Sequence, residues 1–234
     1  MVAVLAATLV VGAGVQGLVG LGVGTVSAPV VTLLAPDLMP GMLLFMGFFT
    51  PALTLVPDRS DIDWRGLAWA LPFRVPGTVV GVLLVVLVDD RALGIGVGAM
   101  VLLSVLVTWR TVRVSATRVN LSVAGLVSGA TATTTSIGGP PIAVVYQHES
   151  SARVRQTLAI YFAVGAVFSL VGLAIAGRIT AADVGLACLL LPSLVLGLVL
   201  ASAVRRRLPT DSIRTGVLVV CAASAIALLV RTAF

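Results

Sequence analysis

The sequence is poor in charged residues and contains no lysine. Charged residues make up 10% of its 234 residues, whereas a soluble domain carries roughly 25%. This shortage excludes an ordinary soluble globular domain. All 15 basic residues are arginines, and the net charge is +6. In a soluble protein this balance would suggest nucleic acid. Here the arginines fall almost entirely between apolar segments, which favours a role in membrane orientation and no nucleic-acid partner.

The sequence also contains few cysteines and no common catalytic or nucleotide-binding motif. The only two cysteines, Cys188 and Cys221, lie inside apolar segments. We therefore expect them to pack in the interior, without a disulfide framework or metal site. The sequence contains no Walker A motif, no H-E-x-x-H and no G-x-S-x-G. We therefore predict no enzyme activity, no catalytic residues, no metal and no cofactor.

The chain is rich in long apolar segments. Hydrophobic residues make up 59% of the sequence, and its mean hydropathy is +1.16. About 20 apolar residues span a bilayer; residues 67–88 contain one charge and residues 92–109 contain none. The N-terminal stretch MVAVLAATLVVGAG lacks a basic region, so we interpret it as a membrane segment and not a signal peptide. The sequence predicts an all-α polytopic membrane protein.

Apolar runs and helix breakers divide the chain into ten segments. Their approximate bounds are 2–19, 26–36, 40–57, 66–88, 92–109, 119–135, 140–147, 155–177, 184–204 and 213–230. The second and seventh segments are too short to cross a bilayer alone. Whether these short arms cross fully or turn back is left open.

The same pattern occurs twice along the chain. GLGVGTVSAPVV (20–31) and SIGGPPIAVVYQ (136–147) are both Gly/Pro breaks followed by a short apolar run, at a shift of 116. Further along, a Leu-Pro pair and a glycine recur at a shift of 120, so that Gly77 corresponds to Gly197. We therefore expect two similar halves, residues 1–113 and 114–234.

The arginines indicate how the breaks sit in the membrane. If each break forms a hairpin, the loops on one side hold eleven arginines and those on the other hold three. If each break belongs to one crossing helix, the count becomes seven on each side. The eleven are Arg59, Arg65, Arg110, Arg113, Arg118, Arg153, Arg155, Arg205, Arg206, Arg207 and Arg214. The positive-inside rule favours hairpins, with the Arg-rich loops in the cytoplasm and both termini outside.

Hairpins make the two halves inverted repeats. Each half then contains one Gly/Pro-broken helical hairpin and three crossing helices, so the second half enters the membrane from the opposite side. Inverted-topology repeats are typical of secondary transporters. An anion carrier is therefore our main hypothesis. A channel, a membrane subunit of a larger transport complex, and an intramembrane enzyme using Ser136 or Ser150 with His148 are the alternatives.

The two breaks predict a binding site for a small anion. Broken helices are tolerated at membrane depth only inside protein or beside a wet cavity. Helix N-termini offer free N–H groups and a positive dipole end, and Pro29, Pro140 and Pro141 suit the first turn of new helices. The candidate substrate-binding residues of the breaks are Gln16, Gly22, Gly24, Thr25, Thr134, Thr135, Ser136, Gly138, Gly139, Pro140 and Gln147. The alternative is that these small residues only allow close helix packing, as the GxxxG pair Gly125 and Gly129 suggests.

The breaks also resemble a known family. GLVSGATATTTSIGGPPIAVVY (125–146), followed by RQTLAIYF (155–162), resembles the second-half signature of the sulfite exporter TauE/SafE family, and GLVGLGVGTVSAPVV (17–31) resembles the first. Val23 stands where that family usually has glycine, and the threonines of 131–135 replace a more apolar or glycine-rich stretch. The resemblance implies a permease of bacterial inner-membrane type for sulfur-containing anions such as sulfite or sulfonates.

Arg74 is the one charge well inside an apolar segment. A central arginine costs at least about 2.5–3.5 kcal/mol on insertion scales, and such charges usually face a pathway or a partner. We therefore predict that Arg74 attracts the substrate. The alternative is that it snorkels to the cytoplasmic interface, because Arg65 lies only nine residues earlier.

Two further polar residues and the partners complete the prediction. His148 and Glu149 follow the seventh segment and either relay protons or form a solvated loop end. We expect a small anionic substrate and membrane lipids as partners. Coupling protons and a second copy of the chain are left as open options.

Overall fold

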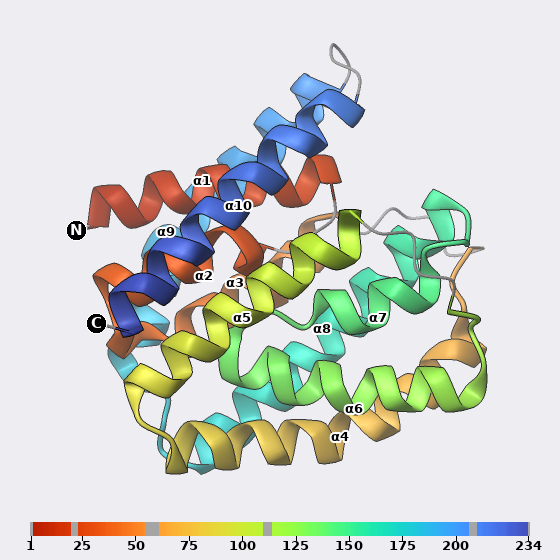
Figure 1. Ribbon diagram of the computed structural model, residues 1–234, viewed down its shortest axis with the longest axis horizontal. Helices are drawn as coiled ribbons and strands as arrows, with labels where there is room; N and C mark the ends of the chain where they lie inside the picture. The colour runs from red at the N-terminus through yellow and green to blue at the C-terminus, as the bar shows by residue number, and fades with distance from the viewer. Residues whose placement is uncertain (1, 20–22, 55–60, 110–113, 206–209, 234) are drawn as a thin grey trace.

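The structure, a computed structural model, consists of α-helices joined by short connections (Figure 1). It describes residues 2–19, 23–54, 61–109, 114–205 and 210–233, and no β-strand occurs among them. The helices are α1 (Val2–Val19), α2 (Val23–Leu34), a 3-10 helix (Pro36–Leu38), α3 (Gly41–Thr54), α4 (Trp64–Leu87), α5 (Asp90–Trp109), α6 (Arg118–Thr135), α7 (Gly139–Tyr146), α8 (Ser151–Ile175), α9 (Ala181–Arg205) and α10 (Thr210–Ala233). The all-α prediction is therefore confirmed, and each of the ten apolar segments corresponds to a helix.

Several helices have the length and surface of membrane segments. Three of them, Trp64–Leu87, Arg153–Ile175 and Ala181–Val204, are long and apolar enough to cross a membrane, and shorter apolar helices accompany them. Large apolar side chains stand exposed on their outer faces, with Leu87 at 78% and Ile175 at 83% exposure. Lipid accepts such a surface because its tails are as apolar as the side chains.

Two expectations were wrong in detail. Pro29 lies inside α2 and not in its first turn, because this helix begins at Val23. Most of α2 is buried, so tertiary packing outweighs the local preference against an internal proline. Cys221 is buried as expected, whereas Cys188 is exposed on α9 beside the exposed Leu189. In a membrane helix an apolar sequence does not distinguish the inward face from the lipid face.

The longest helix contacts cross between the two halves of the chain. Helix α4 packs along α6, and α1 packs along α9. A Cβ on Gly77 would overlap the carbonyl oxygen of Leu126, and one on Gly197 would overlap that of Val10. The same contact thus occurs twice, because Leu126 and Val10 are 116 residues apart and the two glycines are 120 apart.

Glycine packing makes the α4–α6 contact close. A Cβ on Gly125 would overlap the carbonyl oxygen of Ala70, and one on Gly129 would overlap that of Arg74. The packing role predicted for this GxxxG pair is confirmed. Of the remaining helices, α3 packs against α8 and α5 against α10.

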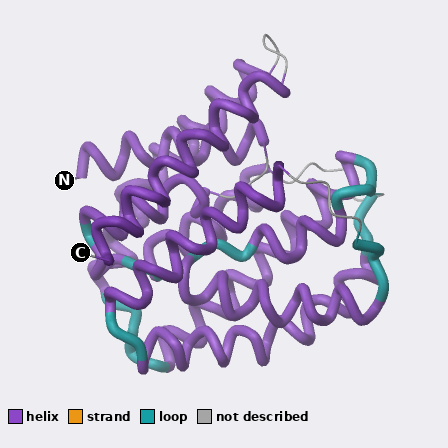
Figure 2. Tube along the Cα trace, in the orientation of Figure 1, coloured by secondary structure: helices purple, strands orange, loops and turns teal. Residues whose placement is uncertain are grey.

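Most of the connections that the structure describes lie at the two ends of the molecule. Figure 2 shows residues 61–63, residues 114–117 and the loop after α7 at the right-hand end, and the loops after α4 and α8 at the left-hand end, near both termini. The loop between α6 and α7, residues 136–138, lies in the middle. The second break therefore sits at mid-depth along the long axis of the bundle.

The arginines at the left-hand end cap helices. Arg91 Nε donates to the carbonyl oxygen of Thr232 at 2.7 Å, and Arg178 Nη2 donates to that of Val86 at 3.0 Å. Arg231 Nη1 donates to the carbonyl oxygen of Leu33 at 3.3 Å. These carbonyls lie in the last turns of α10, α4 and α2, where backbone acceptors lack helical partners and the dipole favours cations.

Substitution of Gly197 tests the crossed packing. Gly197→Ala is expected to lower the free energy of unfolding by about 1–3 kcal/mol, because the added methyl group forces α1 away from α9. Gly185→Ala is the matched control on the same helix: its Cβ would meet nothing within 4 Å, so it should stabilise by about 0.5–1 kcal/mol. Melting of both purified variants in detergent measures the difference, and equal melting temperatures would contradict the contact.

Candidate functional site

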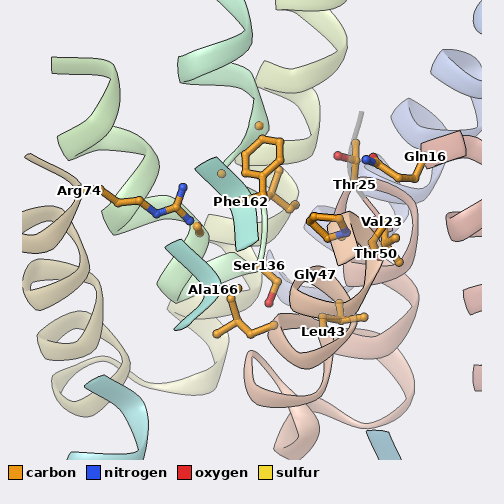
Figure 3. A pocket seen from close by; sticks show the side chains of 17 residues that line it. Gln16, Val23, Thr25, Leu43, Gly47, Thr50, Arg74, Ser136, Phe162 and Ala166 are labelled. Atoms are coloured by element: carbon orange, nitrogen blue, oxygen red, sulfur yellow. The ribbon is translucent and has the colours of Figure 1, made fainter. Parts of the chain in front are cut away.

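A pocket lies where the two breaks meet (Figure 3). Its volume is about 70 Å³, and roughly 10–15 Å³ suffices for one water molecule, so it has room for a small anion. Residues from α1, α2, α3, α4, the α6–α7 break and α8 enclose it. They are Gln16, Val23, Gly24, Thr25, Leu43, Leu44, Gly47, Thr50, Pro51, Arg74, Ala132, Ser136, Ile137, Gly138, Gly139, Phe162 and Ala166.

The N-termini of both short helices open on this pocket. Val23, Gly24 and Thr25 form the start of α2, and Gly138 and Gly139 form the start of α7. Prolines occupy the first turn of α7, as predicted, where a missing N–H costs no hydrogen bond. In α7, Gly138 and Gly139 supply the N–H groups at the helix start, because Pro140 and Pro141 have none. N–H groups at a helix start lack intrahelical acceptors, so this arrangement favours an anion in the pocket.

The two breaks touch directly. A Cβ on Gly24 would overlap the carbonyl oxygen of Ser136, so only glycine allows α2 to approach this closely. Ser136 ends α6 in the left-handed conformation, with φ 59°, which is uncommon outside glycine and costs conformational energy. Its backbone N–H donates to Ala132, and its Oγ donates to the carbonyl oxygen of Pro40 at 3.0 Å.

Arg74 reaches the same pocket from α4 and is 2% exposed. In Figure 3 its guanidinium extends from α4 toward the pocket. The snorkelling alternative is therefore wrong. The guanidinium carbon lies 4.4 Å from the centre of the Tyr161 ring, a cation–π contact. A Cβ on Gly165 would overlap the guanidinium, so this glycine provides its space.

The polar contacts of Arg74 are few. Its Nη1 donates to Ser128 Oγ at 3.4 Å, and Ser128 in turn donates to the carbonyl oxygen of Gly138 at 2.6 Å. Its Nε has no hydrogen-bond partner among the described residues. No acidic side chain in that part of the chain pairs with it; the ion pair there, Arg153 with Glu149, involves other residues. A buried charge without a counter-charge is costly, so Arg74 favours binding of an anion.

Comparison with known proteins identifies the family of this chain. The family model described as sulfite exporter TauE/SafE matches residues 4–228. The chain belongs to this family. TauE/SafE proteins are membrane transporters, and this member is an integral membrane protein. No curated protein and no solved structure matches the chain.

Seven of the predicted site residues of this TauE/SafE protein line the pocket together. They are Gln16, Gly24, Thr25, Arg74, Ser136, Gly138 and Gly139. Thr134 and Thr135 do not line it, and their hydroxyls donate to carbonyl oxygens one turn back in α6. Pro140 is buried in α7, Gln147 follows the last turn of α7, and Gly22 lies outside the described residues.

His148 and Glu149 also lie outside the pocket. Both are exposed beyond the end of α7, and Glu149 Oε2 pairs with Arg153 Nη1 at 3.1 Å. This is the geometry of a solvated loop end. Ser136, one of the two nucleophiles considered in the enzyme alternative, donates its hydroxyl hydrogen bond to the carbonyl oxygen of Pro40.

The sequence did not predict that residues of α3 and α8 line the pocket of this TauE/SafE protein. Gly47, Thr50 and Pro51 interrupt an apolar run, and this was the one available signal for α3. Phe162 and Ala166 of α8 carry no comparable signal. The residues that hold Arg74, above all Ser128 and Tyr161, could not be assigned before the packing of α4 against α6 and α8 was known.

Proposed function

We propose that this protein is a secondary transporter that carries small anions, above all sulfur-containing ones such as sulfite or a small organosulfonate. The observation that supports this most strongly is Arg74: a buried guanidinium, without an acidic partner in the described part of the chain, beside a pocket at the two helix breaks. An arginine presents several N–H donors in a planar fork that suits oxyanions. The unpartnered Nε is one such donor.

The rest of the pocket complements this charge. The N–H groups at the starts of α2 and α7 add partial positive charge. Leu43 and Phe162 contribute an apolar wall, which excludes water and strengthens the electrostatic attraction. We infer that the anion binds between Arg74 and these two helix ends.

We further propose that residues 1–113 and 114–234 are inverted-topology repeats around this site. The matching contacts of Gly77 and Gly197 support a two-fold relation, as do the crossed pairs α4–α6 and α1–α9. The position of the α6–α7 loop in the middle of the bundle supports a hairpin. Alternating access then follows from rocking of the helices around the fixed pocket.

The proposed orientation rests on the arginines. The Arg-rich loops would lie in the cytoplasm and both termini outside, in a bacterial-type inner membrane. The three arginines at the opposite end donate to helix C-terminal carbonyls, so a structural role accounts for their presence there. All three arginines assigned to that side have such a role, which strengthens the charge bias.

Ligand-dependent melting of the purified protein tests the function. The panel is sulfite, sulfate, thiosulfate, sulfoacetate, taurine, carboxylates and chloride. A ligand at 100 times its dissociation constant should stabilise the protein by about 2.7 kcal/mol. We expect a selective shift with a sulfur oxyanion, and saturable counterflow of that anion in proteoliposomes. No selective shift with any anion would overturn the proposal, and a large unitary current would replace the carrier with a channel.

A further inference from the structure

A second cavity lies at the right-hand end of the molecule, away from the pocket of the breaks. It is a groove of about 410 Å³ between the first turns of α4 and the start of α6. These two helices begin at the same end of the bundle and run side by side (Figure 1). The groove is lined by residues of α4 and its cap, and by Ala116, Arg118 and Leu121 at the start of α6. None of the roles described above uses this groove.

Two arginines give this groove its charge. Arg65 and Arg118 both line it and are exposed. Neither pairs with an acidic side chain in the described part of the chain. The guanidinium carbon of Arg118 lies 5.3 Å from the centre of the Trp69 ring, and this cation–π contact holds the charge at the mouth of the groove.

One acidic residue also lines the groove, and its carboxylate is occupied. Asp63 Oδ1 accepts from the backbone N–H of Gly66 at 2.9 Å, which caps α4. Its Oδ2 accepts from Tyr146 Oη at 2.9 Å. The two arginines therefore leave a net positive charge in the groove, and a single phosphate monoanion would neutralise it.

The surroundings of the groove distinguish a lipid from a soluble anion. Trp69, which lines the groove, is 40% exposed, and Trp64, the first residue of α4, is 57% exposed. Tryptophan is enriched where membrane proteins meet the headgroup layer. Beyond them, exposed apolar side chains continue along both helices: Phe73 on α4, and Val119, Val123 and Leu126 on α6. One ligand that matches a basic groove continuous with an apolar helix face is an anionic phospholipid.

We propose that the groove between α4 and α6 binds the headgroup phosphate of an anionic phospholipid, whose acyl chains lie along the exposed apolar face of these two helices. Arg65 and Arg118 bind the phosphate, and Trp69 orients Arg118. Because α4 also carries Arg74, a lipid bound here holds the helix that reaches the substrate pocket. The lipid site itself is independent of the anion that the pocket carries.

Titration of the purified full-length chain in neutral detergent tests this site. The probes are phosphatidylglycerol, phosphatidylcholine with the same acyl chains, and glycerol 3-phosphate, with binding followed by native mass spectrometry and by melting temperature. We expect phosphatidylglycerol to bind and stabilise the wild type more than the other two. In Arg65→Gln/Arg118→Gln its affinity should fall about 30-fold, the combined effect of two arginines near an anionic headgroup.

Two further variants keep the test decisive. Arg153→Gln/Arg155→Gln removes the same charge from exposed positions outside the groove and should change phosphatidylglycerol affinity less than two-fold. Ala68→Glu adds one negative charge at an exposed groove position and should weaken binding about five-fold, so a folding defect of the double variant does not decide the outcome. The proposal would be overturned if both double arginine variants lost phosphatidylglycerol affinity equally, or if the wild type bound the two lipids equally. Full competition by glycerol 3-phosphate would also overturn it.

Discussion

Arg74→Gln is expected to abolish anion binding while leaving the protein at least as stable as the wild type. Glutamine removes a buried charge that has no acidic partner among the described residues, so the folded state loses a desolvation cost. A structural arginine behaves in the opposite way, since its removal leaves its partners unsatisfied. Among the described residues, Ser128 is the one side chain that hydrogen-bonds the guanidinium, and it keeps its 2.6 Å bond to Gly138.

The expected loss of affinity is large. Two unit charges at 4 Å attract by about 4 kcal/mol at an effective dielectric constant of 20, which corresponds to roughly a 1000-fold change. The measurements are the melting temperature with and without the best sulfur oxyanion, and counterflow of that anion in proteoliposomes. Both the ligand-induced shift and the counterflow should disappear in Arg74→Gln.

Arg178→Gln provides the contrasting control. Arg178 donates to the carbonyl oxygen of Val86 in the last turn of α4, far from the pocket. Its removal should lower the melting temperature modestly and leave the anion-induced shift intact. A retained shift in Arg74→Gln, or a melting temperature well below that of the wild type, would assign Arg74 to the scaffold.

Gly24→Ala is expected to damage both stability and binding. The new methyl group would meet the carbonyl oxygen of Ser136, so the two breaks must separate. Overpacking of this kind costs about 1–3 kcal/mol, and the separation also moves the N-terminus of α2 away from that of α7. Gly47→Ala is the matched control, because Gly47 lines the same pocket but its Cβ would meet nothing within 4 Å.

The control should melt at or above the wild-type temperature, since alanine favours a helix over glycine by about 0.5–1 kcal/mol. Its anion-induced shift should remain. Melting curves of the three proteins, each with and without the sulfur oxyanion, measure both effects. Wild-type behaviour of Gly24→Ala would show that the breaks do not need their close contact.

The sequence was sufficient for the helices and the breaks, because lipid enforces long apolar segments and glycine with proline marks their interruptions. It also singled out Arg74, since one charge in an apolar run is conspicuous. We expected Pro29 in the first turn of a new helix, but α2 begins at Val23. Tertiary burial outweighs the local preference of proline here. The threonines at 134 and 135 looked like ligands, yet their hydroxyls bond their own helix.

The remaining part of the site depends on contacts between distant helices. Leu43 and Phe162 face the pocket, but in a membrane helix the inward and outward faces have similar polarity, so periodicity does not separate them. Ser128 is one small residue among many until α4 packs against α6 and brings Arg74 to it. Such pairings follow from the tertiary arrangement and not from any local pattern.

The crossed pairs α4–α6 and α1–α9 impose an order on biosynthesis. Helix α4 is synthesised before α6, and α1 is synthesised long before α9. Until their partners are made, the glycine-lined faces of α4 and α1 therefore contact lipid. Neither half can complete its own bundle. We therefore expect residues 1–113 and 114–234, made as separate polypeptides in one cell, to associate through these two helix pairs into one bundle. Either polypeptide made alone should be degraded.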